Sequence, residues 1–370
     1  MKRLLLCLTA AAMIGLFGGT IATVEEVPFR AAWISTVYQL DYPSQATVQE
    51  DVLKQDALTI IRRAKDMGLN ALILQVRPSS DAIYPSSIFP WSKHLTGSQL
   101  AAPENGFDPL AFWVQQAHEA GIELHAWINP YRITTGKAAE WESLAENHPA
   151  KVHPDWVIAY ADNYYWDPGL PQVRQLVVDG ALEIVNRYEV DGIHLDDYFY
   201  PGQDFADGNT YAAYGTAFSD IEDWRRENVN QLIQLLDSRL HSVKPELRFG
   251  VSPAGIWANQ DSLSQGSKTN GNQSYFSHYA DSRKWVKEGW VDYICPQIYW
   301  PIGHELADYE TLARWWSQIV QETDVDLYIG MADYQAGNSD PVSPWYGISA
   351  LRAQHTLNET LLQVKGGVHF

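Results

Sequence analysis

The sequence predicts a single closed (β/α)8 barrel of the TIM type, and three observations favour that fold class. From residue 29 onward, about eight apolar segments alternate with amphipathic segments of helical length. The strand-like segments are apolar almost throughout, which is typical of parallel strands buried on both faces. No glycine-rich phosphate-binding turn follows the first strand, whereas an open doubly wound sheet predicts one there. We therefore expect residues 28–370 to form one TIM-barrel domain.

The expected elements alternate regularly along the chain. Strands are predicted at 31–37, 70–76, 122–128, 190–195, 247–251, 291–296, 326–331 and 366–370. Helices are predicted at 52–67, 109–120, 171–188, a segment ending near 243, 279–288, 309–321 and 348–362. Gly68 marks the end of the first helix, and Asp108 followed by Pro109 marks the start of the second. The sequence ends at Phe370 on the last strand, so this prediction allows for a barrel without its last helix.

Residues 1–22 read as a signal peptide. Lys2 and Arg3 form a positive n-region, an apolar segment follows at 4–17, and small residues up to Ala22 suit cleavage. The apolar segment is short for a membrane helix, so no stable membrane span is expected. Cys7 comes too early for a lipidation site. We expect an exported protein that is periplasmic, bound in the cell envelope, or extracellular.

The amino-acid composition limits the classes of molecule that the protein is expected to bind. The net charge of −19 argues against binding nucleic acid or an anionic lipid surface. The 15 Trp and 20 Tyr include many in predicted loops, where rings that stack and hydrogen-bond suit the faces of sugars. Cys295 is the one cysteine beyond the signal peptide, which excludes an intramolecular disulfide and a cysteine zinc site. A polysaccharide partner is therefore expected, and neither a metal site nor a cofactor is predicted.

The most informative stretch runs from Asp191 to Pro201. It predicts a buried strand that ends on two adjacent carboxylates, Asp196 and Asp197, within an aromatic loop. In a parallel barrel, catalytic groups sit at the carboxyl ends of the strands. One aspartate alone could be a helix cap or the ion-pair partner of an arginine. Two among aromatic residues favour a catalytic pair.

Polar or aromatic side chains also follow the other predicted strands. In chain order these candidate substrate-binding residues are Trp33, Gln75, Arg77, Trp127, Asn129, Tyr131, Arg132, His194, Tyr198, Ser252, Trp257, Gln297, Tyr299 and Trp300. A purely structural barrel interior is mostly Val, Ile and Leu, and a single polar residue could be a satisfied interior group. A whole rim of amide, guanidinium and indole groups instead favours a cleft that binds sugars through their hydroxyl groups and the faces of their rings.

Several of these motifs, taken in order, resemble one known family. They are 75–78 with 81–86, 125–132, 191–201, 250–253 and 296–300. The chain from about Phe29 to its end is similar to the bacterial glycosyl-hydrolase-like family 10, which includes enzymes that cut peptidoglycan glycan strands stripped of stem peptides. The resemblance implies a TIM barrel with exported glycoside hydrolase activity on envelope glycans.

The central motif is also similar to the strand-four motif of family-18 chitinases. Asp191 and Asp196 fall on two of its aspartates, and Tyr198 falls where its acid Glu stands. In those enzymes the substrate acetamide is the nucleophile, and Gln297 and Tyr299 resemble residues that help to hold it. Because the acid Glu is missing, the roles do not transfer directly.

Glycosidic cleavage needs a proton donor for the leaving oxygen. We expect Asp196 or Asp197 to be this general acid, with the other raising its pKa as a like charge. Tyr299, Asn129 and Arg77 are expected to orient the sugar. The leading interpretation is substrate-assisted hydrolysis of a MurNAc–GlcNAc polymer. The alternatives are a non-catalytic glycan-binding barrel and a hydrolase of another exported polysaccharide, such as a glucanase.

Overall fold

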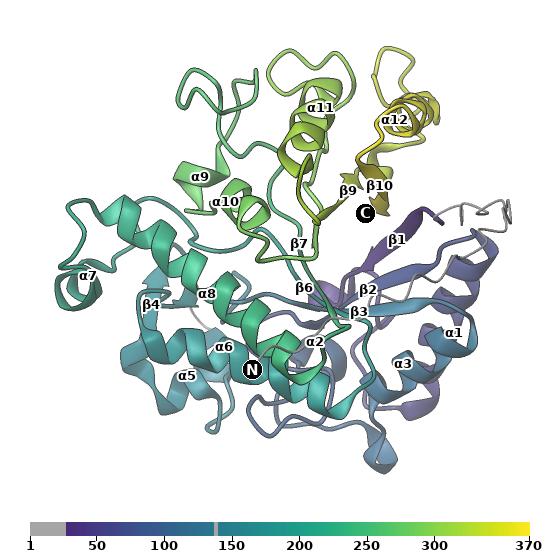
Figure 1. Cartoon of the computed structure of the whole chain (residues 1–370). Helices are drawn as coiled ribbons and strands as arrows, with labels where there is room; N and C mark the ends of the chain where they lie inside the picture. The colour runs from purple at the N-terminus through teal and green to yellow at the C-terminus, as the bar shows by residue number, and fades with distance from the viewer. Residues whose placement is uncertain (1–26, 137–139) are drawn as a thin grey trace, which may run out of the picture.

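The computed structural model describes residues 27–136 and 140–370. These residues form a closed barrel of eight parallel strands with helices packed around it (Figure 1). The predicted (β/α)8 fold is therefore confirmed. The predicted signal peptide, residues 1–22, lies outside the described residues.

The bounds of the elements agree with the predicted segments to within a few residues. The barrel strands are β1 (Phe29–Ile34), β2 (Ala71–Arg77), β3 (Glu123–Ile128), β6 (Gly192–Leu195), β7 (Arg248–Val251), β8 (Tyr293–Ile294), β9 (Asp326–Met331) and β10 (Val364–His369). The main helices are α1 (Glu50–Asp66), α3 (Pro109–Glu119), α6 (Pro171–Arg187), α8 (Ile221–Val243), α10 (Ser282–Lys287), α11 (Tyr309–Val320) and α12 (Ser349–Glu359).

Shorter elements lie in the connecting segments. They are α2 (Lys93–Thr96), α4 (Glu140–Ser143), α5 (Pro149–Val152), α7 (Gly208–Tyr214), α9 (Ser274–Ser277) and the 3₁₀ turns η1 (Val37–Gln39), η2 (Glu104–Gly106), η3 (Pro154–Trp156) and η4 (Asp333–Gln335). A two-stranded antiparallel hairpin, β4 (Val157–Tyr160) and β5 (Asn163–Trp166), lies outside the barrel.

The barrel closes because the first strand pairs with both the second and the last. Ala31 of β1 lies opposite Ala71 of β2, and Phe29 lies opposite Gly366 of β10. The other strands follow in chain order, and β6 pairs directly with β3 because the β4–β5 hairpin is set aside. This register brings the carboxyl ends of the strands to one rim.

The predicted start of α3 is confirmed in atomic detail. The Asp108 side chain accepts a hydrogen bond from the Ala111 backbone N–H at 3.2 Å, and Pro109 is the first helical residue. A carboxylate in this position satisfies a backbone donor that the first turn leaves without a partner.

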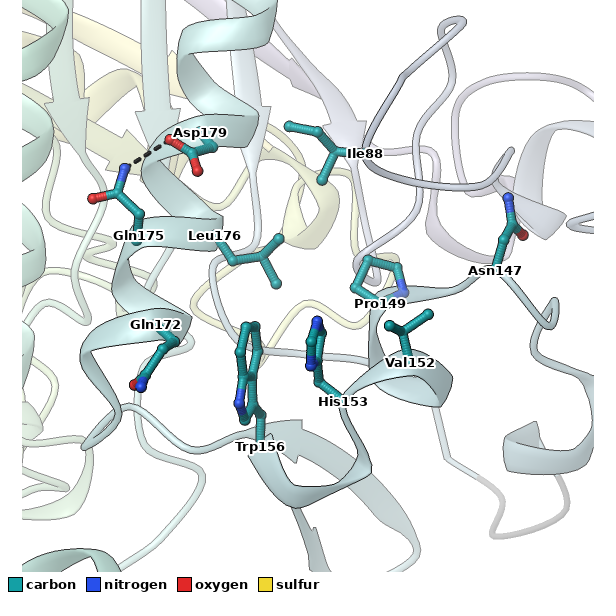
Figure 2. A pocket seen from close by; sticks show the side chains of 10 residues that line it. All are labelled: Ile88, Asn147, Pro149, Val152, His153, Trp156, Gln172, Gln175, Leu176 and Asp179. Atoms are coloured by element: carbon teal, nitrogen blue, oxygen red, sulfur yellow. Dashed lines mark hydrogen bonds between the residues drawn. The ribbon is translucent and has the colours of Figure 1, made fainter. Parts of the chain in front are cut away.

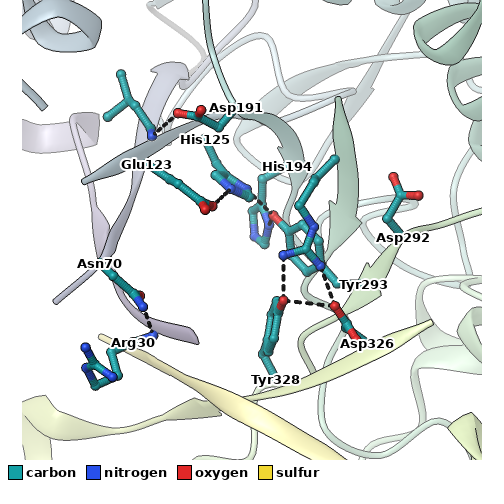
Figure 3. Close-up of polar contacts among 12 residues, drawn as sticks. Arg30, Asn70, Glu123, His125, Asp191, His194, Asp292, Tyr293, Asp326 and Tyr328 are labelled. Carbon is teal, nitrogen blue, oxygen red and sulfur yellow. Dashed lines mark hydrogen bonds and ion pairs between the residues drawn. The ribbon is translucent and has the colours of Figure 1, made fainter. Parts of the chain in front are cut away.

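Hydrogen-bonded rings fill the interior of the barrel. The Tyr293 hydroxyl lies 2.9 Å from Nδ1 of His125 and 3.0 Å from Nδ1 of His194 (Figure 3). Trp33 Nε1 lies 3.2 Å from Nε2 of His194. Because an indole N–H can only donate, Nε2 of His194 accepts and its proton sits on Nδ1. Burial holds the pKa of His194 well below its usual value, in keeping with this neutral form.

Charged groups line a cavity at the lower end of the barrel. Arg248 donates to the Tyr328 hydroxyl at 2.6 Å and to Asp326 at 2.8 Å, and His125 reaches Glu123 at 3.4 Å (Figure 3). Between this cavity and the opposite rim, the hydrogen-bonded rings of His125, His194 and Tyr293 fill the interior.

Glycines make room for these rings. A Cβ atom added at Gly250 would lie 2.0 Å from the ring of Tyr293, which the two histidines hold in place. We expect Gly250→Ala to lower the free energy of unfolding by about 1–3 kcal/mol, because overpacking forces rings or strands to shift.

Urea denaturation measures this effect. Gly208→Ala is the matched control, since a Cβ there meets no atom within 4 Å. A Gly250→Ala protein as stable as the Gly208→Ala protein would show that the interior is loosely packed.

Candidate active site

Asp196 directly follows β6 at the rim and is held by three donors. Trp127 Nε1 lies 2.9 Å from Oδ2, and Asn129 Nδ2 lies 3.2 Å from Oδ1 and 3.1 Å from Oδ2. The Tyr198 backbone N–H donates to Oδ1 at 3.2 Å. Only 3% of Asp196 is exposed. Both of its oxygens are thus occupied, and its orientation is fixed by β3 on one side and its own loop on the other.

Asp197 is half-buried and contacts a different set of residues from Asp196. Its Oδ1 accepts a hydrogen bond from Gln297 Nε2 at 3.1 Å, and the same amide donates to the Ser252 carbonyl oxygen at 2.8 Å. Within residues 27–136 and 140–370, no group hydrogen-bonds to Oδ2 of Asp197. That oxygen is therefore free to meet a substrate.

The environment favours protonation of the pair. Burial raises the pKa of Asp196 to about 6, and the neighbouring Asp197 charge adds to the rise, while Arg132 opposes it. Burial also raises the pKa of Asp197, against the lowering effect of the Gln297 hydrogen bond. A carboxyl group that keeps its proton into this pH range can act as a general acid.

Arg132 approaches the pair without forming a salt bridge to it. Its guanidinium donates to the Pro78 carbonyl oxygen at 3.1 and 2.9 Å and lies 5.2 Å from the centre of the Tyr198 ring. Among the described residues, no Lys or Arg forms an ion pair with Asp196 or Asp197. The paired aspartates are therefore not explained as partners of an arginine.

Aromatic rings surround the carboxylates at the rim. Tyr198 is 53% exposed, and Tyr299 is half-buried with its ring parallel to that of Phe370 at 6.3 Å. Tyr38 and Tyr334, each 63% exposed, follow β1 and β9. Sequence reasoning missed Tyr38, Tyr334 and Phe370, although each stands within a few residues of a strand end.

His278 is a further residue that sequence reasoning missed. Its electrostatic interaction with Asp197 lowers the pKa of that carboxyl group, and its Nδ1 lies 2.9 Å from the Tyr200 carbonyl oxygen. It comes from α9 and the loop after it, a polar stretch whose sequence carried no signal for the site.

Four predicted residues lie beneath the rim rather than on it. They are Trp33, Gln75, His194 and Ser252, each at most 6% exposed. Gln75 Oε1 accepts from the backbone N–H groups of Thr36 and Val37 at 3.1 and 3.0 Å, so it holds the loop after β1. The Ser252 hydroxyl lies 2.9 Å from Nε2 of His194. These side chains support the strand ends from below.

The prediction for Arg77 is wrong. The pairing of β2 with β3 shifts between Gln75 and Arg77, and this irregularity turns Arg77 to the outer face of the barrel. There its guanidinium lies 3.8 Å from the centre of the Phe89 ring and close to Gly180 of α6. It cannot orient a sugar at the rim.

Tyr131 and Trp257 are also not at the site. Tyr131 is fully buried in the main hydrophobic core. Trp257 Nε1 donates to Asp281 at 3.0 Å, and its ring lies parallel to that of Trp315 at 5.9 Å. Both residues come several positions after the end of a strand. The chain has turned there, so the strand's alternation of side chains between its two faces does not predict where they point. Trp300 is half-buried beyond β8, beside Gly255.

The two aspartates that the chitinase-like motif singles out, Asp191 and Asp196, do not lie together. Asp191 lies at the opposite end of β6 from the rim, where Oδ2 accepts from the Leu124 backbone N–H at 2.7 Å and contacts His118 at 2.8 Å. It stabilises the start of the strand. Within the described chain, no cluster of three or more His, Cys, Asp or Glu side chains is arranged to hold a metal ion.

A closed parallel barrel with two desolvated carboxylates and exposed rings at its rim is the architecture of a glycoside hydrolase. Residues 28–347 match the family described as Glycosyl hydrolase-like 10, and the chain belongs to that family. It is accordingly a glycosyl hydrolase.

Curated relatives agree with this assignment. The chain is 45% identical over 375 aligned residues to Glycosyl hydrolase YngK of Bacillus subtilis (strain 168), covering 97% of this chain and 72% of the relative. It is 39% identical over 364 residues to Glycosyl hydrolase DigH of Escherichia coli (strain K12), covering 93% and 82%.

Solved structures share the fold at low identity. The glycoside hydrolase domain of PgaB (BpsB) from Bordetella bronchiseptica matches with a TM-score of 0.59 at 13% identity, covering 92% of this chain and 93% of that one. The endo-β-1,4-mannanase of Thermotoga petrophila matches with a TM-score of 0.56 at 15% identity, covering 94% and 68%. At these identities the likeness concerns the barrel alone.

The Trp127 hydrogen bond gives a direct test of the electrostatics. Because that bond favours the ionised form of Asp196, Trp127→Phe is expected to raise the pKa of Asp196 further, by about one unit or about 1.4 kcal/mol. Carbon-13 NMR titration of the aspartate carboxyl groups measures the shift.

Trp315→Phe provides the control, since that indole donates to the Gln265 carbonyl oxygen at 3.0 Å. An Asp196 titration that stays in place or moves to lower pH in Trp127→Phe would contradict this account.

Proposed function

We propose that the protein is exported and hydrolyses peptidoglycan glycan strands that lack stem peptides, with Asp197 as the general acid. The proposal extends the family assignment from glycosyl hydrolase to a particular polymer. Its substrate rests on the motif resemblance at 75–86, 125–132, 191–201, 250–253 and 296–300. Among the described residues no helix is both long and apolar enough to cross a membrane.

One observation supports the choice of Asp197 above all others. Asp196 has both oxygens occupied by donors, whereas Oδ2 of Asp197 has no partner in the described part of the chain. A general acid must reach the glycosidic oxygen within hydrogen-bonding distance. The free oxygen of Asp197 is the carboxyl atom that can do so.

The remaining groups take supporting roles in this mechanism. Asp197 gives its proton to the leaving glycosidic oxygen, while the carbonyl oxygen of the substrate's own N-acetyl group attacks the anomeric carbon. Asp196 stays fixed beside it by its three donors, and two like charges so close together favour a state in which the pair holds one proton before cleavage. Water then opens the bicyclic intermediate and restores the proton to Asp197.

The rim suits this polymer. Tyr198, Tyr299 and Tyr334 offer ring faces to the sugars, and the Tyr299 hydroxyl is available to hold an acetamide. Arg132 provides a positive charge beside the carboxylates, which suits the lactyl carboxylate of MurNAc. A neutral glucan has no group that would use that charge.

The Asp197→Asn change is the first test. It should reduce the hydrolysis rate of denuded glycan strands about 10²–10⁴-fold, because the proton donor is lost while binding groups remain. Asp261→Asn, an exposed carboxylate on the loop after β7, should leave the rate unchanged. Mass analysis of released saccharides measures both.

The same assay decides the polymer. Denuded peptidoglycan strands, a β-1,4-mannan and a β-glucan are compared for release of reducing ends. Cleavage of the first substrate with loss in Asp197→Asn supports the proposal. Full cleavage by Asp197→Asn would sink the choice of acid, and cleavage of only a glucan or mannan would sink the choice of substrate. Binding to sacculi without any product would support a non-catalytic barrel instead.

A further inference from the structure

A cavity lies on the outer side of the barrel, and neither paired carboxylate lines it. It has a volume of about 470 Å³ and lies between α5 with η3 and the exposed face of α6 (Figure 2). Sites for small ligands typically span about 300–1,000 Å³. None of the rim residues described above lines it, so it is not an extension of the active site.

Two stacked rings form a platform at this cavity. The rings of His153 and Trp156 are parallel to within 7°, with centres 3.9 Å apart. Trp156 is braced in turn by the edge of Trp166 at 6.5 Å. Figure 2 shows the pair edge-on, with Leu176 of α6 reaching toward it. A flat, rigid and half-buried platform of this kind suits the apolar face of a sugar ring.

Polar side chains with unused hydrogen-bonding atoms surround the platform. The side chains of Asn147 and Gln172 make no hydrogen bond to the described residues, and both are exposed. Gln175 donates to Oδ1 of Asp179 at 2.7 Å, which leaves Oδ2 of that carboxylate open (Figure 2). Amides and carboxylates next to a ring platform are the groups that bind sugar hydroxyls.

The charge of the residues that line the cavity limits the class of ligand it can bind. No Lys or Arg occurs among the described residues that line it, and Asp179 contributes a negative charge. Phosphate, nucleic acid and anionic lipid are therefore disfavoured. An uncharged hexose or N-acetylhexosamine unit matches both the ring platform and the amides.

One chain segment builds both this cavity and part of the active site. The segment between β3 and α6 begins with Asn129 and Arg132 at the rim and continues through α5 and η3 to the β4–β5 hairpin. Arg132 pairs with Tyr165 of β5, which ties the hairpin to the rim. This segment therefore contributes Asn129 and Arg132 to the rim and His153 and Trp156 to the cavity.

We propose that this cavity is a second glycan-binding site that takes an uncharged sugar unit of the polysaccharide being cut. It adds affinity for the polymer and takes no part in bond cleavage. The identity of the polymer rests on the proposed function, but the existence of the second site does not depend on which aspartate is the acid.

A double variant, Gln172→Ala with Asp179→Ala, removes two exposed polar groups from α6 without touching the core. Placed in the non-hydrolysing Asp197→Asn protein, it should weaken binding to immobilised denuded glycan strands about tenfold. In the active protein it should raise KM for the polymer by a similar factor and leave kcat on a soluble tetrasaccharide unchanged. Asn186→Ala, an exposed amide on the last turn of the same helix, is the control.

The outcomes separate the two proposals. If the double variant binds and cuts the polymer as well as the Asn186→Ala protein, the second site is refuted while the proposed function stands. A loss of kcat on the tetrasaccharide would show that these residues act on cleavage itself, against this assignment. If no variant, nor the unmodified protein, binds or cuts the polymer, both proposals fail.

Discussion

The hydrogen bonds that hold Asp196 are the interaction on which the active site depends. A carboxylate that is only 3% exposed would be costly without partners, and here the Trp127 indole, the Asn129 amide and a backbone N–H supply them. These bonds tie β3 to β6 across the rim. The Tyr198 backbone N–H that donates to Asp196 also holds the chain on the far side of Asp197, whose carboxyl group accepts from Gln297 instead.

The packed polar interior supports this arrangement from below. His194 lies two residues before Asp196 and is held between the Trp33 indole, the Ser252 hydroxyl and the Tyr293 hydroxyl. A buried network of this kind stabilises one geometry only when its members all have partners. The result is a strand end with little freedom, which suits a catalytic group that must meet one oxygen of a polymer.

Much of this could be predicted from the sequence, because the responsible signals are local. Apolar runs of strand length, the Asp108–Pro109 helix start and the adjacent Asp196 and Asp197 all lie within a few residues of the features they specify. The fold and the presence of carboxylates at the end of β6 followed from these patterns.

The rest depended on contacts between distant segments. Arg77 was assigned to the wrong face because a shift in the pairing of β2 with β3 follows Gln75, and alternation along one strand cannot reveal it. The β4–β5 hairpin was not foreseen because its strands are four residues long and are held by pairing with the segment after β3. Phe370 joined the rim only through closure of the barrel beside β1.

The central claim is that Asp196 and Asp197 act as one coupled pair whose carboxyl pKa values are both raised by burial. The pH dependence of kcat/KM for the unmodified protein and for Asp196→Asn tests it most directly. The account predicts that activity falls on the alkaline side in the unmodified protein, and that this fall moves to lower pH in Asp196→Asn because a like charge has been removed. An alkaline limit that stays at the same pH in both proteins would contradict it.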